Sequence, residues 1–145
     1  MNCTLPKGTY FLGDPCYAIQ DDERWQKIVN HMYDGSHDSD ADVMKISSKN
    51  GKTDACIFYG STAYGDGRYE DQNGNEFPVD AGLIGLVPMS VANPESRVLS
   101  ECGKLVNFVR EVEVSWDEGH FVITDGSQTF IIDTRGNTEE NSEEE

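Results

Sequence analysis

Residues 104–134 decide the fold and read KLVNFVREVEVSWDEGHFVITDGSQTFIIDT. Three strands are predicted here, because two glycine-containing turns divide the apolar runs into Lys104–Trp116, His120–Thr124 and Gln128–Thr134. Side chains along a strand point alternately to its two faces, so the first strand is predicted to have one buried face and one exposed acidic face. The predicted buried face carries Phe108, Arg110, Val112, Val114 and Trp116, and the acidic face carries Glu111, Glu113 and Ser115. Strands joined by such tight turns favour antiparallel pairing.

The rest of the chain adds one main helix, a short second helix and further strands. Asp21 supplies an N-cap to a helix over about 21–33, whose apolar residues recur at helical spacing. Asn93-Pro94 predicts the start of a second helix over about 94–102. Further strands are predicted at Thr9–Leu12, Asp42–Ser47, Thr53–Tyr59, Ala63–Glu70 and Glu76–Val87, with a type I′ turn at Asn73-Gly74. These elements predict an α+β class: an antiparallel or mixed twisted sheet, or half-barrel, in one domain over residues 1–136.

The charge of the chain is strongly negative. The 145 residues include 27 acidic and 11 basic side chains, for a net charge of −16. Residues 137–145 carry five carboxylates and no apolar side chain, which predicts a disordered acidic tail. The body keeps twice as many acids as bases. This balance argues against direct binding to nucleic acid or anionic lipid, and no apolar run approaches the length of about 18 residues that a membrane span needs.

The N-terminal residues lack the apolar core of a secretory signal, so a cytoplasmic protein is expected, in the host cytoplasm if a phage encodes it. The four cysteines are therefore expected as free thiols. Cys56 lies in an apolar run and is predicted to be a small buried hydrophobe, and Cys102 is predicted to have the same role on the second helix.

Two glycine-rich stretches contain the candidate catalytic residues. Asp14 and Cys16 belong to Gly13-Asp14-Pro15-Cys16-Tyr17, where Cys16 could be a nucleophile activated by a histidine. Asp66 and Asp80 lie beside glycines and could converge with Asp14 on a cation. The structural alternative is favoured for both stretches: turns whose aspartates accept backbone hydrogen bonds, with nearby carboxylates that raise the pKa of the thiol.

Metal and cofactor chemistry has little support in the sequence. His31 and His37 lie with four aspartates in residues 31–42 and are the candidate metal ligands, although a solvated acidic loop explains the same run. Phosphate-binding glycine motifs and basic clusters are missing, so no cofactor is predicted.

Thr9–Tyr17 and Thr62–Pro88, with their GDPCY and YGDG…VDAG motifs, resemble a group of small bacteriophage and prophage proteins with no established activity. The resemblance implies a phage or prophage setting and assigns no functional residue.

The predicted function is that of an acidic protein-binding or inhibitory domain, more a binding module than an enzyme. It would dock on a basic host protein, with partial nucleic-acid mimicry as one form of docking. The expected binding residues are Glu111, Glu113, Asp34, Asp38, Asp40 and Asp42. The alternative is a small enzyme or ligand binder with a site around Asp14, Cys16, Asp66 and Asp80.

Overall fold

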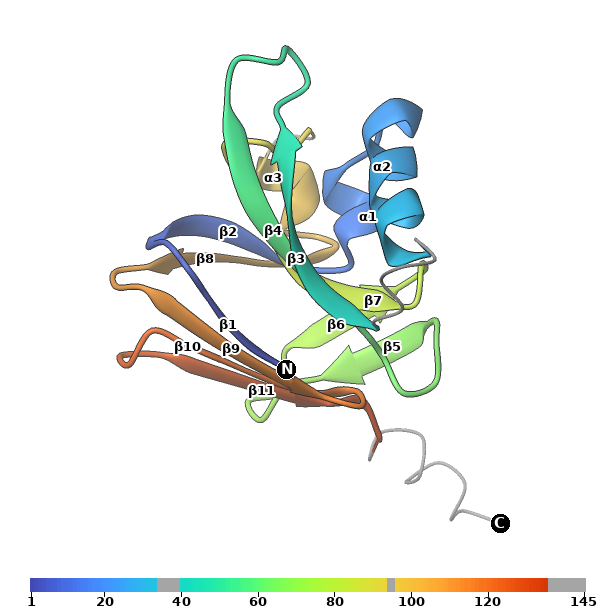
Figure 1. Cartoon of the computed structure of the whole chain (residues 1–145). Coiled ribbons are helices and arrows are strands. Elements are labelled where there is room, and N and C mark those ends of the chain that lie inside the picture. Colours follow the sequence, from blue (N-terminus) through green and yellow to red (C-terminus); the bar gives the residue numbers. More distant parts are fainter. Residues whose placement is uncertain (34–39, 94–95, 136–145) are drawn as a thin grey trace.

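The alternating strands pair into antiparallel sheets, as a computed structural model of the chain shows (Figure 1). The structure describes residues 1–33, 40–93 and 96–135. One sheet has the strand order β1-β9-β10-β11, and a larger one has the order β3-β4-β7-β2-β8. A separate hairpin pairs β5 with β6. The strand bounds are β1 Asn2–Leu5, β2 Gly8–Gly13, β3 Ala41–Ser47, β4 Asp54–Ser61, β5 Gly67–Glu70, β6 Glu76–Val79, β7 Leu83–Pro88, β8 Gly103–Phe108, β9 Val112–Asp117, β10 His120–Thr124 and β11 Thr129–Asp133. The helices are α1 Pro15–Ala18, α2 Asp22–Met32 and α3 Ser96–Leu99.

Both faces of the five-stranded sheet are buried, which creates two separate cores. On one face, Leu12 and Phe58 belong to a cluster that continues to Phe121 in the four-stranded sheet. On the opposite face, Phe11 belongs to a second cluster that includes Ile28 of α2. Successive residues of β2 therefore serve different cores, as the alternation of side chains along a strand requires. The predicted α+β class with a twisted antiparallel sheet is confirmed.

The main helix is confirmed. The side chain of Asp21 accepts a hydrogen bond from the backbone N–H of Arg24 and is the N-cap of α2, whose first turn carries Asp22 and Glu23. Ile28 is fully buried on the apolar face. Arg24 is also buried, which the helical pattern did not predict.

The prediction of one strand over Lys104–Trp116 was wrong, because the chain changes sheet in the middle of it. β8 pairs with β2 in the five-stranded sheet, and β9 pairs with β1 and β10 in the four-stranded sheet. At the crossing, the backbone N–H of Val109 donates to Asp125 Oδ2 at 2.9 Å. Arg110 is consequently exposed rather than buried.

The prediction of a hairpin between Ala63–Glu70 and Glu76–Val87 was right only for its inner part. β5 and β6 pair across the turn, but β7 leaves the hairpin and pairs with β2 and β4. The turn is not type I′, because Gly74 has a positive φ of 84° while Asn73 does not. The N–H of Gly74 donates to the carbonyl of Asp71, so a type I turn followed by a left-handed glycine closes this hairpin.

Two further differences concern short elements, and one prediction is not tested. β1 and α1 were not predicted, because each has only four residues. The second helix is shorter than 94–102: residues 94 and 95 lie outside the described residues, α3 ends at Leu99, and Cys102 follows in a turn. The predicted tail at 137–145 also lies outside the described residues.

Candidate functional site

Asp14 joins the two glycine-rich stretches of the sequence. Its carboxylate is fully buried. Oδ1 accepts the backbone N–H of Cys16 at 2.9 Å and so caps α1. Oδ2 accepts the backbone N–H groups of Asp80 and Ala81, at 2.9 and 2.7 Å, in the connection between β6 and β7. One side chain thus ties the start of α1 to a segment more than 60 residues away along the chain.

The electrostatics of this cluster oppose nucleophilic chemistry. Burial raises the pKa of Asp14, and the three backbone N–H groups offset only part of that rise. Burial, together with the Asp14 and Asp80 carboxylates, raises the pKa of the Cys16 thiol far above its ordinary value. Cys16 is therefore a neutral thiol at physiological pH, whereas a nucleophile needs a thiolate.

The structure brings together three of the four candidate residues of the alternative site. Cys16 and Asp80 lie against Asp14, and the hydroxyl of Tyr17 donates to Asp80 Oδ2 at 2.9 Å. Asp66 is exposed in the connection before β5 and, within the described residues, makes no hydrogen bond to the other three. The shallow groove of about 380 Å³ that Cys16 borders runs over the start of α2 and includes none of the candidate aspartates. The geometry favours a structural tether.

His31, one of the two candidate metal ligands, pairs with an aspartate of β3. Nε2 of His31 is 2.9 Å from Asp42 Oδ2, so this pair links the last turn of α2 to β3. Asp42 also accepts the backbone N–H of Val43. His37, the other candidate ligand, lies outside the described residues. Among the described side chains, no group of three or more His, Cys, Asp and Glu residues is arranged to hold a metal ion.

The expected acidic binding residues fall into two places. Glu113 projects from the outer face of β9, where its cross-strand neighbours are Thr4 and Thr124. Glu111 is exposed directly before β9. Asp40 is exposed directly before β3. Asp34 and Asp38 lie outside the described residues.

A groove of about 640 Å³ lies on the outer face of the four-stranded sheet. Its lining includes Val122 beside Asn2, Thr4, Glu113, Ser115 and Thr124, so a single carboxylate lies among hydroxyl, amide and apolar groups. Within the described part of the chain, Glu113 has no ion pair with a basic side chain. We call this outer face, with Glu111 and Asp117 at the two ends of β9, the β9 face.

Sequence reasoning missed a second groove, which has a volume of about 600 Å³. Its lining includes Lys7, Tyr10, Lys45, Cys56 and Met89. Part of the signal was in the sequence: the predicted strands Asp42–Ser47 and Thr53–Tyr59 are joined by a loop that contains Asn50-Gly51. In the structure they pair as β3 and β4, with Lys45 opposite Cys56. Cys56 is accordingly half-buried at a groove, not fully buried as predicted.

No family model matches the chain, and neither a curated protein nor a solved structure is significantly similar to it. None of the helices in the described ranges combines the length and hydropathy needed to span a membrane.

Proposed function

We propose that the protein is a small acidic binding module that docks on a basic protein partner through the β9 face. The observation that supports the proposal is a row of three exposed carboxylates at alternate positions on and directly before β9: Glu111, Glu113 and Asp117. Within the described residues, none of these side chains forms an ion pair with a basic group, and only Asp117 lies near one, where it helps to raise the pKa of Arg135. Unpaired surface carboxylates raise the rate of encounter with a positively charged surface and select against acidic partners.

The spacing of the row favours docking over full nucleic-acid mimicry. Glu113 and Asp117 project from the same face of β9, with Ser115 between them. Four residues of antiparallel strand span about 14 Å, whereas duplex DNA presents one charge for about every 1.7 Å of its axis. A partner would therefore recognise a few carboxylates in a groove lined by hydroxyl groups rather than a continuous row of charge.

The resemblance to bacteriophage proteins gives this proposal a setting. In an infected cell, a basic surface is typical of host proteins that bind nucleic acid, because they neutralise phosphates with Lys and Arg. The module would act in the host cytoplasm and inhibit such a protein by occupying its basic surface.

Affinity capture at two salt concentrations tests the proposal. The full chain should retain a basic partner from host lysate at about 0.1 M salt and release it at about 1 M, where the Debye length falls from about 10 Å to about 3 Å. The double variant Glu111→Gln/Glu113→Gln should lose the partner. The matched control Glu70→Gln/Glu101→Gln removes the same charge from exposed positions outside β9 and should keep it. Equal capture by both double variants would show that net charge, and not the β9 face, holds the partner.

A further inference from the structure

The groove beside Cys56 carries a local charge opposite to that of the whole chain. Lys7 and Lys45 are exposed at the groove. In the described ranges neither ammonium group forms an ion pair. Asp54 is the one acidic side chain in the lining, and its Oδ1 accepts a hydrogen bond from Ser47 Oγ at 2.7 Å. Two cations therefore face one carboxylate in a protein whose net charge is −16.

The floor of the groove is apolar and held in place. Tyr10 is 3% exposed, and its hydroxyl donates to the carbonyl of Pro6 at 2.6 Å, which fixes the ring against the connection between β1 and β2. Burial raises the pKa of Tyr10 to about 12, so the ring adds no negative charge at neutral pH. Cys56 and Pro88, which lie on the same face of the sheet as Tyr10, continue this apolar lining.

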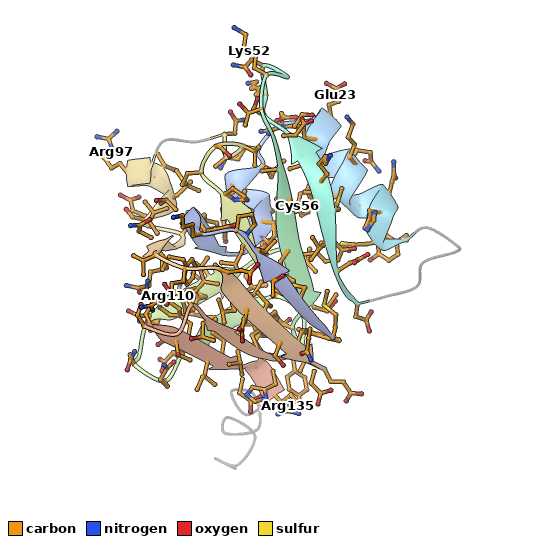
Figure 2. The ribbon with its side chains drawn as sticks, turned by 60° about the vertical axis from the view of Figure 1, so that its left-hand side comes forward. Glu23, Lys52, Cys56, Arg97, Arg110 and Arg135 are labelled. Carbon is orange, nitrogen blue, oxygen red and sulfur yellow. The ribbon has the colours of Figure 1, made fainter. Side chains whose placement is uncertain are left out.

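The strand register explains why these groups meet. Lys45 on β3 is directly opposite Cys56 on β4, so both side chains lie on the same face of the five-stranded sheet. Tyr10 on β2 is opposite Pro88 at the end of β7. Figure 2 shows Cys56 on β4 near the middle of one side of the molecule and Lys52 at the far tip of the β3–β4 hairpin. Four strands and the β1–β2 connection thus contribute to one concave surface.

We infer that this groove binds a small amphipathic monocarboxylate, with the carboxylate between Lys7 and Lys45 and the apolar part on Tyr10, Cys56 and Pro88. The volume lies within the range of about 300–1,000 Å³ that is usual for small-molecule sites, and an apolar lining with a few polar groups is typical of them. The excess of one positive charge suits a single anionic group better than a polyphosphate. The inference is independent of the β9 face, which lies on the other sheet.

Isothermal titration calorimetry of the full chain with decanoate tests the inference, with decanol and decyltrimethylammonium as neutral and cationic controls. Saturable binding of one decanoate is expected, with much weaker binding of both controls. Lys7→Gln and Lys45→Gln should each weaken decanoate binding about fivefold, the factor that corresponds to one ion pair at about 4 Å in water. Lys52→Gln removes the same charge from the hairpin tip, outside the lining, and should leave the affinity unchanged.

Alkylation of Cys56 by iodoacetamide gives a second, local measurement. At a decanoate concentration of ten times the dissociation constant, the rate at Cys56 should fall about tenfold, because only the free fraction reacts. Cys102, which is outside the lining, should react at an unchanged rate. The inference is overturned if decanol binds as tightly as decanoate, if all three lysine variants behave alike, if Cys56 is not protected, or if no decanoate binds.

Discussion

Removal of the Asp14 carboxylate should destabilise the fold more than the loss of an ordinary surface acid. Asp14→Ala removes a fully buried carboxylate and leaves the part-buried backbone N–H groups of Cys16, Asp80 and Ala81 without their acceptor. A hydrogen bond contributes about 0.5–1.5 kcal/mol net, so the loss of three predicts a decrease of about 2–4 kcal/mol in the free energy of unfolding. That loss is a large part of the 5–15 kcal/mol typical of a whole domain.

Urea unfolding followed by tryptophan fluorescence measures this loss, since Trp25 and Trp116 report on different cores. Asp80→Ala is the matched control: Asp80 is exposed, and the substitution removes only the hydrogen bond from Tyr17. Its effect should stay within about 1 kcal/mol. The reasoning is refuted if Asp14→Ala unfolds within about 1 kcal/mol of the wild type with an unchanged m value.

Two further predictions concern Asp125 and Gly60. Burial acts to raise the pKa of Asp125, but the N–H groups of Gln128, Ser127 and Val109 outweigh it and hold the pKa well below its ordinary value. The folded state therefore binds fewer protons than the unfolded state, so the stability that Asp125 contributes is present above about pH 4 and is lost as the pH falls below it. The stability difference between wild type and Asp125→Asn should narrow from pH 7 to pH 2, and a difference independent of pH would contradict this. In Gly60→Ala, the new Cβ would lie 2.6 Å from Cδ1 of Trp116. The free energy of unfolding should therefore fall by about 1–3 kcal/mol, and the fluorescence emission of Trp116 should shift. Unchanged emission and stability would show that the ring moves freely.

The parts of the fold predicted correctly depend on neighbours close in sequence. The N-cap at Asp21 and the apolar face around Ile28 lie within one helix, and the β3–β4 hairpin closes on a short loop. Local hydrogen bonds and side-chain periodicity determine such elements, so they are visible in a single sequence. The prediction of one strand over 104–116 was wrong because the change of sheet depends on pairing partners far away in the sequence. The alternation of apolar and polar residues continues through Arg110, although the chain leaves one sheet there and enters the other.

The candidate site also has a part that the sequence predicted and a part that it did not. The sequence identified Asp14, Cys16 and Asp80 as unusual and already favoured hydrogen-bonded turns, and the structure adds that Asp14 joins both stretches. The exposure of Glu113 was predicted from the alternation of side chains along its strand. The groove beside Cys56 was not predicted, because Lys7 and Met89 reach it only through the pairing of distant strands.

By itself, the sequence determined the α+β class, the acidic character and the main helix, since each depends on composition or on contacts within a few residues. Only the tertiary structure decided which strands share a sheet, that Asp14 is a tether rather than part of an open site, and where unpaired lysines meet an apolar floor. The physical reason is that burial and long-range strand pairing determine both the pKa of a side chain and its partners. Neither quantity is encoded in any single stretch of the chain.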